Sequence, residues 1–106
     1  MALVIEQQGE RILARIEGEF NIFRAAELKP ALLECLASGH DIEIDLSHVD
    51  EIDTSGVQLM LMLKREAART ARQLSFVRHS AAALSVIDLL NLAGVLGDPV
   101  LITHLN

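Results

Sequence analysis

An alternating segment, DIEIDLS at residues 41–47, constrains the fold more than any other part of the sequence. Its apolar residues point one way and its acidic residues the other, which predicts a half-buried strand. A helical pattern follows from about Ser55 to Arg72, and a further strand pattern, LSFV, lies at residues 74–77. A strand, a helix and a second strand in this order predict parallel strands joined by a right-handed crossover.

The sequence before residue 41 predicts a hairpin and a helix. Two short strand patterns, LVIEQ and RILARIE, flank Gly9 and are typical of strands joined by a tight turn. Apolar residues at helical spacing then predict a helix over residues 23–39. Pro30 lies inside that pattern and removes a backbone donor, so we expect it to kink or delay the helix.

The C-terminal part adds a third helix and a weak strand. Ser80 can cap a helix over Ala81 to Leu92, and PVLI at residues 99–102 favours a last strand. The acidic face of the segment 41–47 indicates that helices cover only one face of the sheet. We therefore predict one α/β domain over residues 1–106, with a mixed, mostly parallel sheet of four to five strands and helices on one face.

Charge and composition argue against several classes of function. The net charge of −6 over 106 residues argues against binding to nucleic acid or to an anionic membrane surface. The lone Cys35 cannot form an internal disulfide, and no Cys/His spacing typical of a metal site occurs, so we expect no cofactor. The N-terminus lacks a signal-peptide pattern, and the apolar run Val57 to Leu63 is far shorter than the roughly 20 residues of a membrane helix. We expect a soluble, cytoplasmic protein.

The junction DTSG, between the strand at 41–47 and the next helix, holds the candidate site. Asp53 and Thr54 are residue types that accept hydrogen bonds from free N–H groups at a helix start. Ser55 then lies beside the positive end of the helix dipole, where we expect its hydroxyl to be exposed. Gly56 leaves the backbone open to close approach. Because such residues cap helices in most proteins, the local pattern alone favours a simple cap over a functional serine.

A catalytic role for Ser55 finds no support in the sequence. The residues around it lack the first glycine of the G-x-S-x-G motif of serine hydrolases, and no histidine lies at a spacing that suggests a catalytic base. No phosphate-binding loop pattern or metal cluster supports an enzyme or a nucleotide-binding protein either. We therefore do not predict an enzyme.

The helix after Ser55 has an apolar face and a polar face. At about 100° per residue, the residues that can cover the sheet are Val57, Met60, Leu63, Ala67, Ala68 and Ala71. Met62 falls on the opposite face, among polar residues that include Gln58 and Arg65. An exposed methionine near a serine at a helix start is typical of an adaptable docking patch. It is equally typical of a side chain that packs against another helix.

The segment IDLSHVDEIDTSGVQLMLML resembles the signature segment of STAS domains, the family of bacterial anti-sigma factor antagonists. The resemblance covers essentially the whole chain, through the order of elements and the motifs EGEF, DLS and DTSG. It implies partner switching, in which a partner that is both serine kinase and anti-sigma factor phosphorylates Ser55 and a phosphatase reverses the reaction. Thr54 is the second choice for the phosphorylated residue. Asp53, Gly56 and Asn21 would surround it, and Asn21 stands where the family often has an acid.

The resemblance also leaves a second interpretation open. Some STAS domains are regulatory subunits of bacterial lipid-transport ATPases, and others are attached to chemosensory complexes. In either case, as in a partner-switching protein, the face formed by Gln58, Met62 and Arg65 would bind the partner. Ser55 would then be a contact that is not modified.

Overall fold

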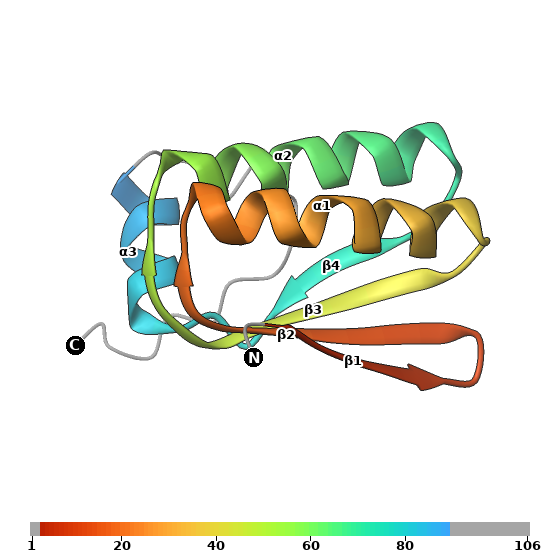
Figure 1. Cartoon of the computed structure of the whole chain (residues 1–106), viewed down its shortest axis with the longest axis horizontal. Coiled ribbons are helices and arrows are strands. Elements are labelled where there is room, and N and C mark those ends of the chain that lie inside the picture. Colours follow the sequence, from red (N-terminus) through yellow and green to blue (C-terminus); the bar gives the residue numbers. More distant parts are fainter. Residues whose placement is uncertain (1–2, 90–106) are drawn as a thin grey trace.

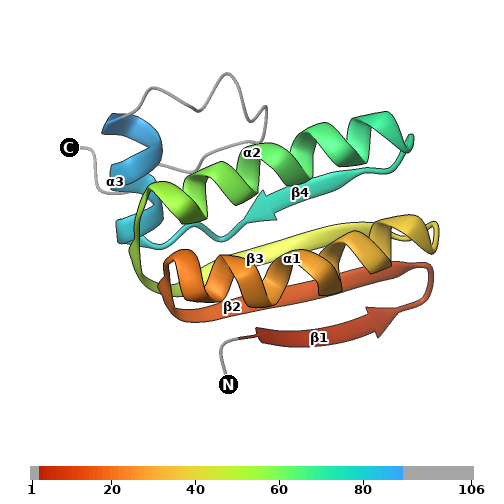
Figure 2. The ribbon, with the colours of Figure 1, turned by 45° about the horizontal axis from the view of Figure 1, so that its top comes forward.

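The computed structural model describes residues 3–89, which form one sheet and the helices that pack on it. The elements in chain order are β1 (Leu3–Gln8), β2 (Arg11–Phe20), α1 (Ile22–Ala37), β3 (Asp41–Ile52), α2 (Thr54–Arg69), β4 (Leu74–Val77) and α3 (Ala81–Leu89). The sheet order is β1-β2-β3-β4; β1 pairs antiparallel with β2, and the other neighbours pair parallel. Helices α1 and α2 lie side by side over one face of the sheet, and α3 lies beside the end where they begin (Figures 1 and 2).

This architecture confirms the predicted α/β fold with a mixed, mostly parallel sheet. The hairpin around Gly9 and the strand at residues 74–77 are also as predicted. The strand expected at residues 99–102 and the end of the third helix, residues 90–92, lie outside the described residues.

The hydrophobic core lies between the sheet and the two long helices. Alternate strand residues face it and are buried: Ile12, Ala14, Ile16, Ile42, Ile44, Leu46, Leu74 and Phe76. The helices complete it with Leu28, Leu32 and Leu36 from α1 and with Leu59, Met60, Leu63 and Ala67 from α2. These spacings are those of one face of a strand and one stripe of a helix, which is why the sequence pattern predicts them.

The buried face of α2 differs in part from the predicted one. Leu59 is buried although the helical spacing placed it only at the margin of the apolar face, whereas Ala68 is exposed. Ala71 lies beyond the helix, which ends at Arg69 rather than at Arg72, and takes a left-handed conformation with φ of 58°. A residue in this conformation commonly ends a helix, and here it turns the chain toward β4.

Pro30 does not delay α1; a delay is one of the two effects, with a kink, that the sequence predicts. The helix runs through the proline, whose side chain is exposed. The buried Leu28, Leu32 and Leu36 lie on both sides of it. Burying three leucines contributes roughly 1.5–3 kcal/mol each, which exceeds the cost of about 3 kcal/mol for a proline in a helix interior. Packing against the sheet therefore sets the extent of this helix.

β3 is longer than predicted because its pairing with β2 continues beyond residue 47. Two register shifts interrupt the β2–β3 ladder, and the pairing then runs on to Phe20 opposite Ile52. The paired ends of the two strands curve toward the helices in Figure 1. They place the starts of α1 and α2 next to each other at one end of the sheet.

Asp45, in β3, is the one buried charged residue within the described part of the chain. Burial raises the pKa of its carboxyl, but hydrogen bonds from Ser47 and from the Arg78 guanidinium, at 3.2 Å, outweigh burial. The pKa of Asp45 is therefore held below its ordinary value of 3.8.

The stability of the fold should depend on the ionisation of Asp45. A carboxyl whose pKa is lowered by folding adds stability above its unfolded pKa, and this contribution is lost as the pH falls through the folded pKa. We expect Asp45→Asn to lose less stability than the wild type between about pH 5 and pH 2 in urea unfolding. Glu10→Gln, at an exposed position beside the hairpin turn, is the control and should follow the wild type. Parallel curves for wild type and Asp45→Asn would contradict the prediction.

Candidate functional site

Two neighbouring helix starts form the candidate site. The Asn21 Oδ1 atom accepts hydrogen bonds from two backbone N–H groups of α1, at 3.1 and 3.2 Å, and caps that helix. The Asp53 Oδ1 atom accepts hydrogen bonds from the N–H groups of Ser55 and Gly56, at 2.9 and 3.2 Å, and caps α2. Each cap therefore already occupies backbone donors that a helix start could otherwise offer to an anion.

Gly56 is buried, and the group that approaches it closely belongs to the protein itself. A Cβ atom at this position would lie 2.6 Å from the Phe20 carbonyl oxygen and 3.0 Å from side-chain atoms of Phe20 and Ile52. The same Phe20 carbonyl accepts a hydrogen bond from the Asp53 N–H group at 3.3 Å. The absence of a side chain thus lets α2 start directly against the end of β2, and it does not open the backbone to an outside ligand.

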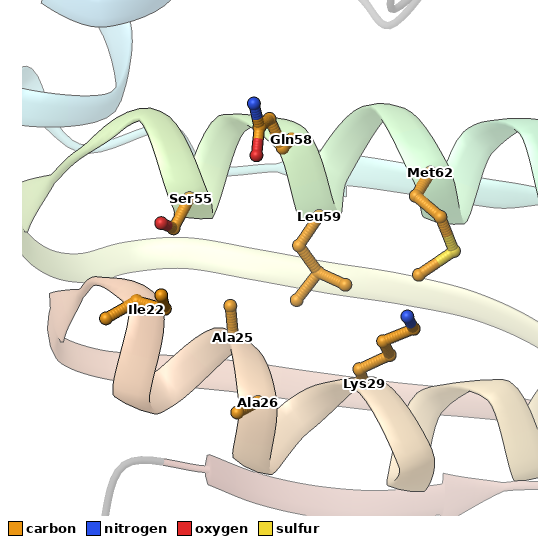
Figure 3. Close-up of a pocket in the computed structure, with 8 residues that line it drawn as sticks. All are labelled: Ile22, Ala25, Ala26, Lys29, Ser55, Gln58, Leu59 and Met62. Carbon is orange, nitrogen blue, oxygen red and sulfur yellow. The ribbon is translucent and has the colours of Figure 1, made fainter.

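A groove of about 420 Å³ runs between α1 and α2 from these helix starts (Figure 3). Its lining consists of Ile22, Ala25, Ala26 and Lys29 of α1 and Ser55, Gln58, Leu59 and Met62 of α2. Both helices follow parallel strands and therefore run in the same direction. In Figure 3, Ser55 points toward Ile22 at one end of the groove, and Met62 approaches Lys29 at the other.

The structure brings three of the predicted site residues together in this groove. Ser55 is half-buried, Gln58 is exposed and Met62 is half-buried, and all three line it. Thr54 is the first residue of α2; it is exposed and does not line the groove. Arg65 is also exposed and lies beyond the lined part of α2.

The sequence-based interpretation missed the contribution of α1 to the site. Ile22 and Phe23 follow the Asn21 cap, and both are strongly exposed although they are large apolar residues. Lys29 supplies the one cationic side chain among the groove residues. Two consecutive apolar residues directly after a cap, outside the spacing of the buried leucines, are the sequence signal that could have indicated them.

An acidic hollow lies at the helix-start end of the groove. It is lined by Glu19, Phe20, Asn21, Glu51, Ile52 and Asp53, none of which carries a positive charge. We call Glu19, Glu51 and Asp53 the acidic rim. Glu19 accepts a hydrogen bond from the Asn21 amide at 3.2 Å, so the rim contacts the α1 cap and, through Asp53, includes the α2 cap. The groove is therefore lined mainly by apolar side chains, and the hollow beside its helix-start end carries three carboxylates.

Residues 3–89 do not meet the requirements of a metal site, a membrane-spanning helix or a reactive cysteine. No group of His, Cys, Asp and Glu side chains in that range is arranged to hold a metal ion. None of the helices there has the length and apolar character needed to span a bilayer. Burial, with the nearby Glu34 charge, raises the pKa of the half-buried Cys35 thiol, which makes it less reactive.

Several solved structures share this fold. An anti-sigma factor antagonist from Mycobacterium paratuberculosis is 19% identical, with a TM-score of 0.80 over 96% of this chain and 86% of that one. The anti-sigma factor antagonist SpoIIAA in its unphosphorylated form is 20% identical, with a TM-score of 0.76 over 88% and 84%. The phosphorylated form of the Bacillus cell fate determinant SpoIIAA is 21% identical, with a TM-score of 0.72 over 88% and 86%.

The family of the chain follows from its sequence. No curated protein matches it. Identities near 20% to the solved structures show the fold alone. The family model described as "Mlab, STAS domain", however, matches residues 3–102, which is nearly the entire sequence. The chain therefore belongs to the STAS domain family.

Proposed function

We propose that this STAS domain is a binding module of the anti-sigma factor antagonist kind, controlled by reversible phosphorylation of Ser55. The observation that carries the proposal is the position of Ser55, half-exposed at the start of α2 and lining an apolar groove. The partners would be a serine kinase that is also an anti-sigma factor, and a phosphatase, acting in the cytoplasm. The binding surface would be the groove, with Gln58 and Met62 as contacts and Arg65 at its margin.

A phosphate on Ser55 would change the groove without refolding the domain. It adds about −1.5 to −2 charges at neutral pH. The backbone N–H groups of Ser55 and Gly56 already donate to Asp53, so the phosphate would have to displace that carboxylate to use them. The added charge would therefore remain at the groove, beside an existing carboxylate. A partner whose apolar side chains fill the groove would have to strip water from the phosphate, which is costly.

The proteins of similar structure support this proposal by their shared fold and by their description as anti-sigma factor antagonists. Two of the solved structures are of SpoIIAA, in an unphosphorylated and in a phosphorylated form. Asn21 is the departure from the family pattern in this chain. Since it caps α1 as an acid would, the change removes one negative charge near Ser55 and preserves the local structure.

The direct test is phosphorylation by the cognate serine kinase. We expect incubation with ATP to add one phosphate, which mass spectrometry of peptides should place on Ser55. Ser55→Ala should accept none, whereas Ser80→Ala, at the serine whose hydroxyl accepts from Ala83 N–H at the start of α3, should be phosphorylated like wild type. Phosphate on Thr54 instead would identify Thr54, the second choice, as the phosphorylated residue. The absence of phosphate after incubation with that kinase would contradict the proposal.

A second candidate function is a STAS subunit that binds its partner without modification, in a lipid-transport ATPase or a chemosensory complex. The observation that favours it is the largely apolar lining of the groove, which can bind a partner with Ser55 as a plain contact. Protein isolated from its own cells would then carry no phosphate. An ATPase or a chemoreceptor would co-purify in a complex that Ile22→Asp disrupts, because Ile22 lines the groove.

A further inference from the structure

The start of α1 exposes an unusual amount of apolar surface. Ile22 is 60% exposed and Phe23 is 79% exposed. Four large apolar side chains are exposed within residues 3–89, and two of them are these neighbours. Exposed apolar residues that adjoin one another and a groove commonly mark a site of protein contact. Ile22 lines the groove between the helices, and the exposed Phe23 is the next residue of α1.

We propose that this surface binds an amphipathic helix of the partner protein, with apolar side chains in the groove and basic side chains over the acidic rim. The inference rests on the proposed function, because it names the chemistry of the partner that the groove would take. Ile22 and Phe23 are the apolar anchors of the site. Glu19 and Glu51 of the acidic rim receive the arginine or lysine side chains.

Charge complementarity supports a basic partner. The acidic hollow is lined by carboxylates without a cation, and Lys29 lies at the far end of the groove, where Met62 approaches it. Asp53 already accepts two backbone hydrogen bonds, whereas Glu51 is exposed and available to a partner. Like charges across an interface cost several kcal/mol, so an acidic partner segment is disfavoured here.

The arrangement of the apolar surface matches a helix. Along α1 and α2 the groove is lined by residues three, four and seven positions apart, so that it runs parallel to both helix axes. An amphipathic helix places apolar residues at the same spacing and can lie along such a groove. The rim lies at the helix-start end of the groove and not inside it, so basic residues near one end of the partner helix reach the rim as its apolar stripe enters the groove.

Two other occupants fit the charges less well. An anionic lipid surface would bring negative charge toward the acidic rim and toward a chain whose net charge is −6. A second copy of this chain carries the same net charge of −6 and the same acidic rim, so pairing of two copies would bring like charges together.

The test uses the full chain and two synthetic amphipathic helices. Both peptides carry leucines at helical spacing; one has arginines near one end of the stripe, and the other has glutamates in their place. Binding is measured by NMR, from the changes in backbone amide chemical shifts of the isotope-labelled protein. We expect the arginine peptide to bind about tenfold more tightly, with shifts at the starts of α1 and α2. Phe23→Ala should weaken it about tenfold, whereas Ile5→Ala, at an exposed apolar residue of β1, should not.

A second pair of variants tests the contribution of the acidic rim to peptide binding. Glu51→Lys should weaken the arginine peptide about fivefold and strengthen the glutamate peptide, with both effects reduced by salt. Glu10→Lys makes the same change of net charge beside the hairpin turn and should leave both affinities unchanged. Equal binding of the two peptides, no saturable binding of either, or shifts elsewhere on the protein would overturn the inference.

The same samples separate the alternatives. Co-sedimentation with anionic vesicles that Phe23→Ala abolishes would assign the surface to a membrane instead, and dimerisation that Phe23→Ala abolishes would assign it to a second copy. Peptide binding requires no phosphate, so it would support this inference even if Ser55 proved not to be phosphorylated. Phosphorylation of Ser55 without peptide binding would refute the inference and leave the proposed function intact.

Discussion

Gly56→Ala should destabilise the protein by about 1–3 kcal/mol, the usual cost of overpacking a filled interior. The new Cβ atom would lie 2.6 Å from the Phe20 carbonyl oxygen, a backbone atom held in the β2–β3 ladder. Neither α2 nor β2 can yield without disturbing the Asp53 cap or the pairing of Phe20 with Ile52. Urea unfolding monitored by circular dichroism should show the loss as a lower midpoint with an unchanged slope.

The sign of this effect distinguishes it from ordinary helix propensity. Replacing glycine by alanine inside a helix usually stabilises by roughly 0.5–1 kcal/mol. Ser55→Ala, at the adjacent position, adds no atom and is the matched control; its stability should stay within about 0.5 kcal/mol of wild type. A Gly56→Ala protein that is as stable as wild type would show that the contact with Phe20 relaxes readily, contrary to our prediction.

Phosphorylation of Ser55 should lower the affinity for the proposed kinase partner about hundredfold, which corresponds to about 2.8 kcal/mol. The phosphate would enter a groove lined mainly by apolar side chains, next to a carboxylate that already holds the nearest backbone donors. Both its volume and its hydration oppose a partner that fills the groove. Calorimetric titration of the phosphorylated and unphosphorylated protein would measure the difference.

Two variants isolate the charge from the loss of the hydroxyl. Ser55→Ala removes the hydroxyl without adding charge and should bind the partner within about threefold of wild type. Ser55→Asp adds a carboxylate and should weaken binding at least tenfold, while the midpoint of urea unfolding changes little. Binding of Ser55→Asp as tight as that of wild type would count against control by charge at this position.

The parts of the fold that sequence predicts are those with a local period. The alternation in residues 41–47 and the spacing of the leucines in α1 identify the buried faces before any contact is known. The rest of β3 lacks such a signal, because Ser47 and His48 are both exposed and the alternation stops there. Its pairing depends on β2 and on register shifts that no local pattern encodes.

In the candidate site, too, some features follow from local sequence and others depend on contacts between distant residues. Asp53 as a cap and Ser55 at the helix start follow from residue type, since the chemistry of a helix start is local. The contribution of Ile22 and the close approach of Phe20 to Gly56 depend on two helix starts meeting in space. Sequence therefore predicts the serine and its cap, but not the groove in which the serine lies.

The paired ends of β2 and β3 carry both helix starts outside the alternating residues that fill the core. Ile22, Phe23 and Glu51 are all exposed there, so replacing them removes little of the burial that stabilises the domain. Under the proposed function, related proteins can thus exchange one partner for another during evolution by altering a few positions while their interiors stay the same. After gene duplication, two such proteins could therefore acquire different partners without passing through an intermediate protein of low stability.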